Sequence, residues 1–306
     1  MPHPSASAPT PTTSGTDLSA AQVARWRRRL AQRLTVERDL PWRRTRDPWL
    51  ILVAEVMLQQ TQVARVAPAF ERFTSQFPDV ETCAAASRAD VVTAWAGLGY
   101  HRRAVAIHES AKVITADHNG VVPSDLEGLL ALPGIGPYTA RAILAFAFED
   151  DVAVVDTNVA RVLARAVVGA PLGATAAQRL ADSLLTKGNG WAHNQSMLDL
   201  GARWCTATPT CAGCPLRRSC RWAREGWPLP DPAWRTAGTS RPQERFVGSN
   251  REARGLVLAR ARLGPIGPTE LADLAVSLGD ERITTAVAGL VADGLLERTR
   301  GGLRLA

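Results

Sequence analysis

The chain has 306 residues, 46% of them apolar, with 36 Lys and Arg against 29 Asp and Glu and a formal net charge of +7. This length predicts about two or three domains with their own cores, and the composition excludes a collagenous, coiled-coil or disordered chain. Lys112 and Lys187 are the only lysines, so almost all the positive charge is arginine, which binds phosphate bidentately. The basic balance favours a polyanionic partner.

The first segment of the chain, residues 1–18, is rich in Pro, Ser and Thr and lacks both a basic start and an apolar middle. This composition predicts a disordered tail and not a signal peptide. The longest apolar candidate, Trp49 to Leu58, is interrupted by Glu55 and falls short of the roughly 18 residues that a membrane span needs. We therefore expect no membrane association and a cytoplasmic, nucleoid-associated protein.

Helical periodicity dominates the chain from Ser19 onward, so the predicted fold class is mostly α. Ser19 to Leu34 has the pattern of an arginine-rich amphipathic helix. Asp47 with Pro48 provides an N-cap and a first-turn proline for an apolar helix that runs to Gln62. Further helices are predicted at Ala64–Gln76, Arg88–Ala96 and His101–His118.

Glu55 lies within an apolar run, between Ile51 and Leu58. A carboxylate among apolar side chains is costly to keep ionised, so we expect a raised pKa and a proton held near neutral pH. Such a group is suited to act as a general acid. The alternative is a glutamate at the solvent edge of an amphipathic helix.

A glycine-rich turn, Leu132 to Pro137, lies between two predicted helices. Ser124 with Glu127 has the pattern of a capping box for the first helix, and Pro137 occupies the first position of the second. Gly134 and Gly136 would let the backbone approach a ligand closely, with helix N-terminal amides facing an anion such as a DNA phosphate. The alternative is an ordinary turn between helices.

Asp156 ends the one strand-like run, Val152 to Val155, and precedes a helix predicted over Asn158 to Val168. At an N-cap, backbone amides and the helix dipole favour the carboxylate, so we expect a low pKa. One carboxyl group with a raised pKa and one with a lowered pKa could together protonate a leaving group and stabilise a cationic sugar. A purely structural N-cap would also explain Asp156.

Four of the five cysteines lie close together, with the pattern Cys205-x5-Cys211-x2-Cys214-x5-Cys220, whereas Cys83 lies apart. In a chain without an export signal this clustering indicates a metal site and not disulfides. Four thiolates suit either tetrahedral zinc or a [4Fe–4S] cluster. The arginines around the last cysteine would form a basic loop for backbone phosphates or simply a solvated charged face. They are Arg217, Arg218, Arg221 and Arg224.

A composition break at residues 225–243 is rich in Pro and Gly and predicts a linker. After it, helical spacing at Asn250–Arg262, Pro268–Leu278 and Glu281–Asp293 precedes two short strand-like runs between Leu295 and Ala306. This order indicates a small winged-helix-like domain, or otherwise a helical packing module.

Five motifs follow one another along the chain: Glu55-Val56-Met57-Leu58-Gln59-Gln60-Thr61-Gln62-Val63, Gly97-Leu98-Gly99-Tyr100, Leu132-Pro133-Gly134-Ile135-Gly136-Pro137-Tyr138-Thr139, Val155-Asp156-Thr157-Asn158-Val159 and the four-cysteine loop. In this order they resemble the motifs of the helix-hairpin-helix DNA glycosylases, and more narrowly those of the adenine DNA glycosylases of the MutY type, over about Leu40 to Trp222. The resemblance implies excision of adenine mispaired with 8-oxoguanine or guanine after the base is flipped out of the duplex. It also implies a [4Fe–4S] cluster, with zinc as the weaker alternative.

The resemblance implies four subdivisions of the chain after the tail. A cluster-bearing helical subdomain would comprise residues 19–44 and 151–224, and a second subdomain with the helix-hairpin-helix would comprise residues 45–150. The linker at 225–243 and the winged-helix-like domain at 244–306 follow. Many members carry a longer MutT-like C-terminal domain, so this chain resembles a shorter form.

Roles for individual residues follow from the matched motifs. Glu55 would protonate the adenine, and Asp156 would stabilise the resulting sugar cation. Asn158 and Tyr138 would line the same pocket, and Trp42, Arg43 and Gln195 would border the adenine. The expected DNA contacts are Gln59, Gln60, Thr61, Leu98, Tyr100, Gly134, Gly136, Arg217 and Arg218, of which Gln60 and Tyr100 would insert into the base stack.

Tyr138 distinguishes subfamilies, because the related endonuclease III enzymes have a lysine here whose amine attacks the sugar. A phenol cannot form that Schiff base, so the resemblance implies a monofunctional glycosylase without strong lyase activity. The expected partner is double-stranded DNA with a mispaired or damaged base, bound by a monomer. Two alternatives stay open: a thymine or uracil mismatch glycosylase of the same fold, and a non-catalytic iron–sulfur DNA-binding regulator.

Overall fold

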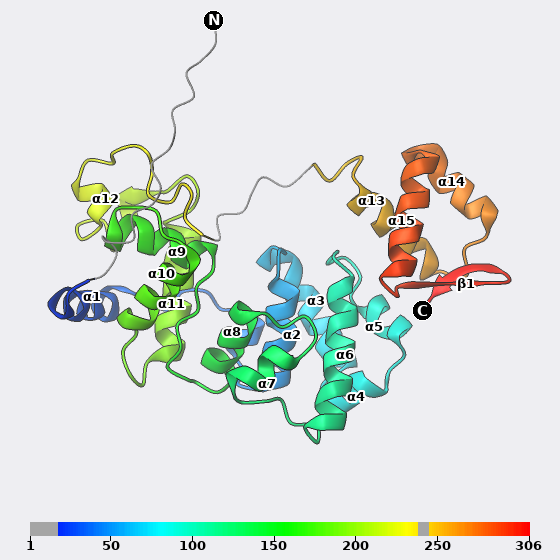
Figure 1. The fold of residues 1–306 in the computed structure, drawn as a ribbon, viewed down its shortest axis with the longest axis horizontal. Helices are drawn as coiled ribbons and strands as arrows, with labels where there is room; N and C mark the ends of the chain where they lie inside the picture. Colours follow the sequence, from blue (N-terminus) through cyan, green and yellow to red (C-terminus); the bar gives the residue numbers. More distant parts are fainter. Residues whose placement is uncertain (1–17, 238–244) are drawn as a thin grey trace, which may run out of the picture. The chain divides into compact units, whose positions relative to one another are not determined.

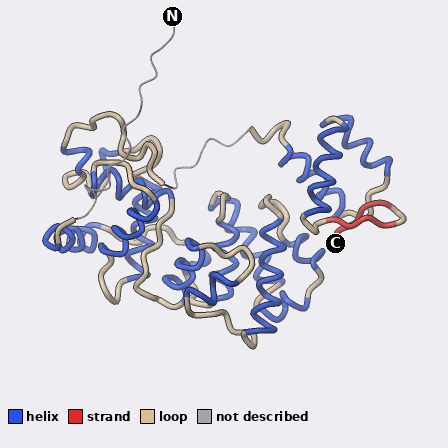
Figure 2. The backbone as a smooth tube through the Cα atoms, in the orientation of Figure 1, coloured by secondary structure: helices blue, strands red, loops and turns tan. Residues whose placement is uncertain are grey.

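The computed structural model describes residues 18–237 and 245–306, so the predicted N-terminal tail and residues 238–243 of the predicted linker lie outside the described residues. The chain divides into two compact units, each built from two separate segments. Unit 1 comprises Met1–Glu37 and Asp151–Ser240, and unit 2 comprises Arg38–Asp150 and Arg241–Ala306. The fold is mostly helical, as predicted (Figures 1 and 2).

Unit 1 is a helical bundle that carries the cysteine loop. Its elements are α1 (Ala20–Arg33), α9 (Thr157–Val162), η3 (Leu163–Val168), α10 (Ala174–Leu184), α11 (Gly190–Arg203), η4 (Cys211–Gly213) and α12 (Arg221–Arg224). The predicted first helix is confirmed: Ser19 caps α1 in a capping box with Gln22, and Trp26 and Leu30 bury its apolar face in the core. The predicted helix after Asp156 forms as α9 and then continues as η3, which is π-helical.

The run Val152 to Val155 forms no strand, contrary to its strand-like alternation. Its backbone is bonded by side chains instead, because Asn194 on α11 accepts from the Val154 amide at 2.9 Å and donates to the Val152 carbonyl at 2.8 Å. Side-chain amides thus take the place of a neighbouring strand.

Part of the predicted linker is structured on unit 1. Ala233 and Thr236 are buried, the Ala237 amide donates to the Leu172 carbonyl at 2.8 Å, and Asp231 forms an ion pair with Arg165. Residues 225–237, the described part of the predicted linker, form no helix or strand, but the Pro-rich composition does not reveal that they pack against the unit.

Residues 38–150 of unit 2 form a helical array around Leu52, Met57, Phe73, Trp95 and Ile143, all of which are almost fully buried. The elements are η2 (Pro41–Arg43), α2 (Pro48–Leu58), α3 (Val63–Gln76), α4 (Val80–Ala85), α5 (Arg88–Ala94), α6 (Arg102–Asp117), α7 (Leu126–Ala131) and α8 (Pro137–Ala147). Asp47 caps α2 by accepting from the amides of Trp49 and Leu50. α2 packs against α3 and α8, which places it at the centre of this array.

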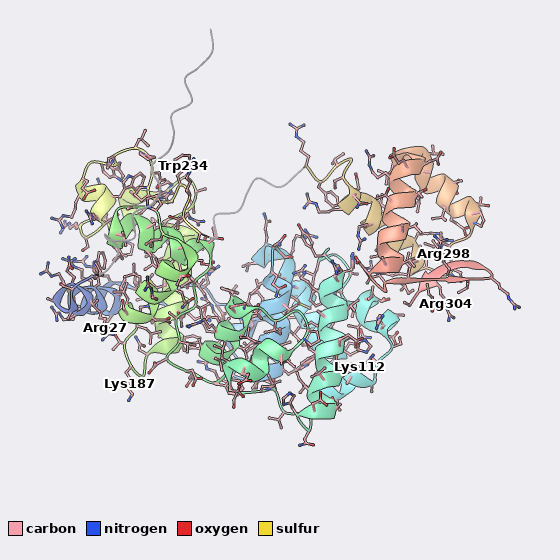
Figure 3. All side chains as sticks on the ribbon, in the orientation of Figure 1. Arg27, Lys112, Lys187, Trp234, Arg298 and Arg304 are labelled. Atoms are coloured by element: carbon pink, nitrogen blue, oxygen red, sulfur yellow. The ribbon has the colours of Figure 1, made fainter. Side chains whose placement is uncertain are left out.

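The C-terminal segment of unit 2 forms the predicted helices and a two-stranded hairpin. They are α13 (Asn250–Ala261), α14 (Pro268–Leu278), α15 (Asp280–Ala292), β1 (Leu296–Thr299) and β2 (Gly302–Leu305). β1 and β2 are antiparallel and carry Arg298 and Arg304 as exposed side chains (Figure 3). Within the described residues, no helix is long and apolar enough to cross a membrane.

Candidate active site

Glu55 is buried in the middle of α2, with 4% of its surface exposed. Its helix is buried on every side from Ile51 to Met57, so a solvent-edge glutamate is excluded. The position is therefore one at which a carboxyl group is withdrawn from water, as the sequence predicted.

α2 ends at Leu58, four residues earlier than predicted, and Gln59 to Thr61 form a turn. Gln60 has a φ of +54°, in the left-handed region that non-glycine residues rarely adopt, and its side chain is exposed. The Gln59 side chain donates to the carbonyl of Gly134 at 3.4 Å and to Thr139 at 3.2 Å. Gln59 is thus hydrogen-bonded to the glycine-rich turn and to α8, whereas the Gln60 side chain is exposed to solvent.

Arg103 on α6 is a buried residue that sequence reasoning missed. Its guanidinium donates to the carbonyls at the end of α2 and in the loop before α6, and to the Thr61 hydroxyl at 3.0 Å. The carbonyl acceptors are Val56, Met57, Gln59, Leu98, Gly99 and Tyr100, at 2.6–3.4 Å. Arg103 therefore satisfies the C-terminal carbonyls of the Glu55 helix and fixes the Gln60 turn to the Tyr100 loop. Nothing local in the sequence signals this role.

The loop from Gly97 to Tyr100 presents one of its two predicted contact residues. Gly97 and Gly99 have φ values of +86° and +69°, which explains why glycine occupies both positions. Leu98 is 2% exposed and its side chain belongs to the core, so its contact with DNA stays a prediction. Tyr100 is 38% exposed, with a φ of +47°.

The predicted hairpin forms between α7 and α8, with one correction. The N-cap of α7 is Asp125, which accepts from the Gly128 amide, and not Ser124. Gly134 has a φ of +75°, and a Cβ there would lie 2.6 Å from the Cβ of Ala106. Gly136 is the N-cap of α8 and, as a glycine, caps it without a side-chain hydrogen bond.

The remaining predicted residues of unit 2 lie at the start of α8 and on η2. Pro137 is the first residue of α8 and Tyr138 the second, with its side chain half-buried. Trp42 and Arg43 lie on η2, at 4% and 8% exposure. Trp42 packs edge-on against Phe70 with ring centroids 5.7 Å apart.

Asp156 caps α9, as predicted. One of its oxygens accepts from the Val159 amide at 2.7 Å, and the other accepts from the Asn158 side chain at 2.6 Å. Asn158 in turn accepts from Arg161 at 2.5 Å. These bonds fix the carboxyl group, and Asn158 is its direct partner.

The predicted low pKa of Asp156 is wrong. Burial raises the pKa of Asp156 above its ordinary value and outweighs the hydrogen bonds from Val159 and Asn158 that favour the anion. Sequence reasoning counted the cap and the helix dipole but could not count desolvation. Asp156 is therefore a well-ordered carboxyl group whose charge is costly in the free protein.

Gln195 lies on α11 with 3% exposure. Its neighbour Asn194 fixes the segment before Asp156 through the bonds to Val152 and Val154 described above. The helix that carries Gln195 is therefore tied to the strand-like segment that leads to Asp156.

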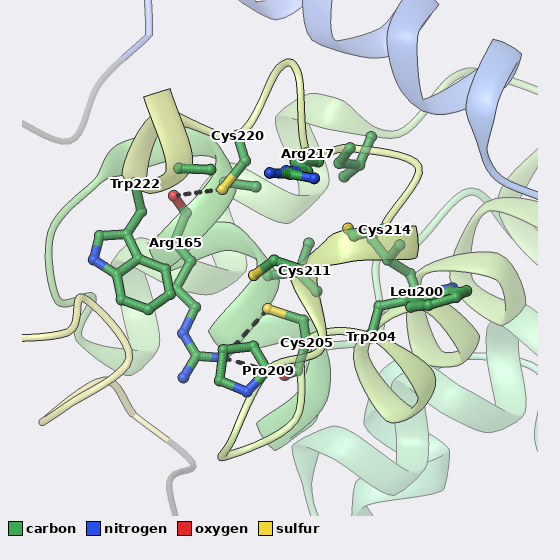
Figure 4. Close-up of a pocket in the computed structure, with 14 residues that line it drawn as sticks. Arg165, Leu200, Trp204, Cys205, Pro209, Cys211, Cys214, Arg217, Cys220 and Trp222 are labelled. Carbon is green, nitrogen blue, oxygen red and sulfur yellow. Dashed lines mark hydrogen bonds between the residues drawn. The ribbon is translucent and has the colours of Figure 1, made fainter. Parts of the chain in front are cut away.

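The four clustered cysteines line one pocket in unit 1, together with Arg165, Leu200, Trp204 and Trp222 (Figure 4). The described part of the chain contains no group of three or more His, Cys, Asp or Glu side chains already in metal-binding geometry. Burial raises the pKa of Cys205 and of Cys214, and raises that of Cys220 to about 11. The donor set fits a thiophilic group, which would bind the thiolates and draw them together.

Arg165 on η3 holds the loop that contains the first of these cysteines. It is 2% exposed, donates to the Thr206 carbonyl at 2.7 Å and the Ala207 carbonyl at 3.2 Å, and lies 3.5 Å from the sulfur of Cys205. Asp231 binds it bidentately at 2.5 and 2.8 Å. Burial alone would lower the pKa of Arg165, but the bonds to Asp231 and Cys205 outweigh it and raise the pKa.

Arg217 and Arg218, the predicted phosphate contacts of the cysteine loop, are both exposed. Arg217 lines the thiol pocket and lies 6.0 Å from the ring of Trp227.

The predicted catalytic residues are divided between the two units. Unit 2 carries Glu55, Tyr138 and the residues expected near the adenine on η2, and unit 1 carries Asp156, Asn158, Gln195 and the cysteine loop. The glycine-rich turn and the Gln60 turn, which sequence reasoning treated as separate motifs, are joined within unit 2 through Gln59.

The helical fold with its glycine-rich hairpin is that of a superfamily of DNA repair proteins. Residues 53–181 match the family described as HhH-GPD superfamily base excision DNA repair protein. A thermostable thymine-DNA glycosylase has a similar structure, with a TM-score of 0.61 and 27% identity over 67% of this chain and 98% of that one. A trapped endonuclease III–DNA covalent intermediate gives a TM-score of 0.58 at 23% identity, covering 69% of this chain and all of that one, which shows the shared fold.

Sequence similarity identifies the family within this superfamily to which the chain belongs. The adenine DNA glycosylase of Mycobacterium tuberculosis is 43% identical to this chain over 274 residues, which cover 87% of this chain and 88% of the relative. The chain belongs to the adenine DNA glycosylase family.

Proposed function

We propose that this protein removes adenine mispaired with 8-oxoguanine or guanine from double-stranded DNA. The observation that carries the proposal is a carboxylic acid buried within α2, Glu55, in a chain of this family. The enzyme would extrude the adenine from the stack, because the glycosidic bond is inaccessible inside a duplex.

In this proposal Glu55 donates a proton to N7, a basic nitrogen of the adenine ring. The bond between the sugar C1′ and the base nitrogen then breaks, and its electron pair stays with the protonated purine. Burial at 4% exposure favours the neutral acid, which holds the proton to be given. Trp42, Arg43 and Gln195 would border the base.

Asp156 stabilises the sugar cation that the departing base leaves behind. Its two oxygens are fixed by Val159 and Asn158, so the carboxylate needs no reorganisation when the cation forms. The desolvation that raises its pKa also strengthens its attraction to a nearby cation. Water then adds to C1′ and loses a proton, which completes hydrolysis.

Tyr138 at the second position of α8 makes the enzyme monofunctional in this proposal. Strand cleavage through a Schiff base needs an amine nucleophile, which a phenol does not provide. Gln60, with its exposed side chain on a fixed turn, and Tyr100 would insert beside the extruded base. The amides at the start of α8 would bind a phosphate, as would Arg217 and Arg218.

We further propose that the four thiols of unit 1 hold a [4Fe–4S] cluster. The four thiolates would bind the cluster and so fix the loop, while Arg165 holds the same loop through the Thr206 and Ala207 carbonyls. The purified protein should be brown with broad visible absorbance, and a colourless protein with stoichiometric zinc would contradict the cluster.

The likeness to a thymine-DNA glycosylase makes thymine opposite guanine the second candidate substrate. Single-turnover base release should therefore be measured on adenine opposite 8-oxoguanine, guanine and thymine, beside thymine and uracil opposite guanine. We expect release of adenine opposite 8-oxoguanine and guanine only. Release of thymine or uracil without release of adenine would reject the adenine assignment.

A further inference from the structure

The C-terminal helices of unit 2 contact α5 and α6 through arginines on both sides. Arg262 donates to the Val92 carbonyl at 3.4 Å and lies 3.1 Å from the Nε2 atom of His101. From the other side, Arg88 donates to the Gly294 carbonyl at 3.2 Å. Guanidinium groups bonded to backbone carbonyls fix direction as well as distance.

His101 is neutral at physiological pH and can accept from Arg262. Burial is the main cause that lowers the pKa of His101 to about 4, followed by the charges of Arg262, Arg254 and Arg103. Asp293, which follows α15, forms two ion pairs at the same contact. Its carboxylate oxygens lie 3.4 Å from the Arg102 guanidinium on α6 and 2.5 Å from the Arg254 guanidinium on α13.

The same contact reaches Tyr100, the residue directly before His101. Arg251, the second residue of α13, donates to the Tyr100 hydroxyl at 3.3 Å. The guanidinium of Arg103 lies 5.5 Å from the Tyr100 ring. The ring is thus held by α6 and its hydroxyl by α13, although the side chain is 38% exposed.

We propose that Arg251 is a positioning residue for lesion recognition, through which the C-terminal domain holds Tyr100 in the conformation that enters the duplex. The inference rests on the proposed function, in which Tyr100 inserts into the base stack. A side chain ordered before binding loses less entropy on binding, and a left-handed residue keeps its conformation only where its surroundings fix it. The C-terminal domain would then act on the reaction without touching the base that is removed.

The contact can be tested without any activity, because Tyr100 and Tyr138 are the only tyrosines in the chain. Full-length protein labelled with 3-fluorotyrosine should give two ¹⁹F resonances, which Tyr138→Phe assigns. Arg251→Ala should shift the Tyr100 resonance and leave the Tyr138 resonance in place, which also shows that the variant is folded. Arg260→Ala is the matched control, because Arg260 lies on the same helix but pairs with Glu270 at 2.7 Å. It should shift neither resonance.

Equilibrium binding supplies the functional part of the test. On a duplex with adenine opposite 8-oxoguanine, Arg251→Ala and Tyr100→Phe should each weaken binding by about 3- to 10-fold, which is the range expected from freeing one ordered side chain. The double variant should bind no worse than either single variant, since both remove the same contact.

The two hypotheses fail in different ways. An unchanged Tyr100 resonance in Arg251→Ala, or losses of affinity that add in the double variant, would overturn the role of Arg251. Absence of adenine release by the wild-type protein would instead overturn the proposed function.

Discussion

The surroundings of Glu55 and Asp156 withdraw two carboxyl groups from water by different means. Glu55 lies in the middle of a helix that is buried on every side, so its environment is made by side chains from the whole array around α2. Asp156 lies at the start of a helix, where the Val159 amide and the Asn158 side chain bond both of its oxygens. The first site is buried inside a helix, and the second lies at a helix start with its two oxygens hydrogen-bonded.

The difference shows which property each site preserves. Desolvation inside a buried helix disfavours the charged form of a carboxyl group, whereas a capped carboxyl group keeps a fixed orientation even when desolvation raises its pKa. Substitutions that change only charge, and leave shape intact, should therefore separate the chemistry of each site from its contribution to the fold.

Asp156→Asn is expected to have the largest effect, reducing adenine release to background in single-turnover assays. Asparagine is as good an N-cap as aspartate, so α9 and DNA binding should be preserved. Asp156→Ala is the control for the cap and should lower the free energy of unfolding by about 1 kcal/mol. Equal loss of binding and release in Asp156→Asn would mean that Asp156 serves only the fold.

Glu55→Gln should slow adenine release by about 10²- to 10⁴-fold, because the amide keeps the volume of the acid but carries no proton to donate. Duplex affinity should stay within a few-fold of wild type. A near-normal single-turnover rate would show that another group is the acid.

The substitution Arg165→Met tests how much Arg165 stabilises the cysteine loop, and does not concern the two carboxyl groups. The change removes the buried partner of Asp231, and the free energy of unfolding should fall by about 3 kcal/mol in chemical denaturation. Arg221→Met is the matched control, since its pair with Glu225 is exposed on both sides and should contribute less than about 1 kcal/mol. Equal effects of the two changes would contradict the role given to Arg165.

A loss of folding stability is also expected at acidic pH. Burial lowers the pKa of His193 on α11 to about 4, below the ordinary 6.5. The unfolded chain therefore takes up this proton first as the pH falls, so the stabilisation is complete above pH 6.5 and is lost between 6.5 and 4. The loss should be roughly 3 kcal/mol, and His193→Gln should reduce the slope over this range. An unchanged slope in the variant would show that His193 does not cause it.

Much of the helical framework could be predicted from local signals. Ser19, Asp47 and Asp156 each cap the helix that their position in the sequence indicated, and the apolar run around Glu55 is buried. These features depend on residues a few positions apart, which is the range that periodicity and capping rules cover.

The errors arise where distant residues decide the structure. At the early end of α2, the Gln59 carbonyl accepts from Arg103, which lies 44 positions later. No rule that considers only neighbouring residues predicts this bond. The raised pKa of Asp156 depends on burial by the rest of unit 1, which no local pattern shows. Likewise, the Pro-rich segment gives no sign that Asp231 pairs with Arg165, 66 positions earlier.

The most direct test of the proton-donor role of Glu55 is the pH dependence of single-turnover adenine release from a duplex with adenine opposite 8-oxoguanine. The wild-type rate should fall as the pH rises and the donor loses its proton, and the Glu55→Gln variant should lack this fall. The same decline with pH in both proteins would contradict the account.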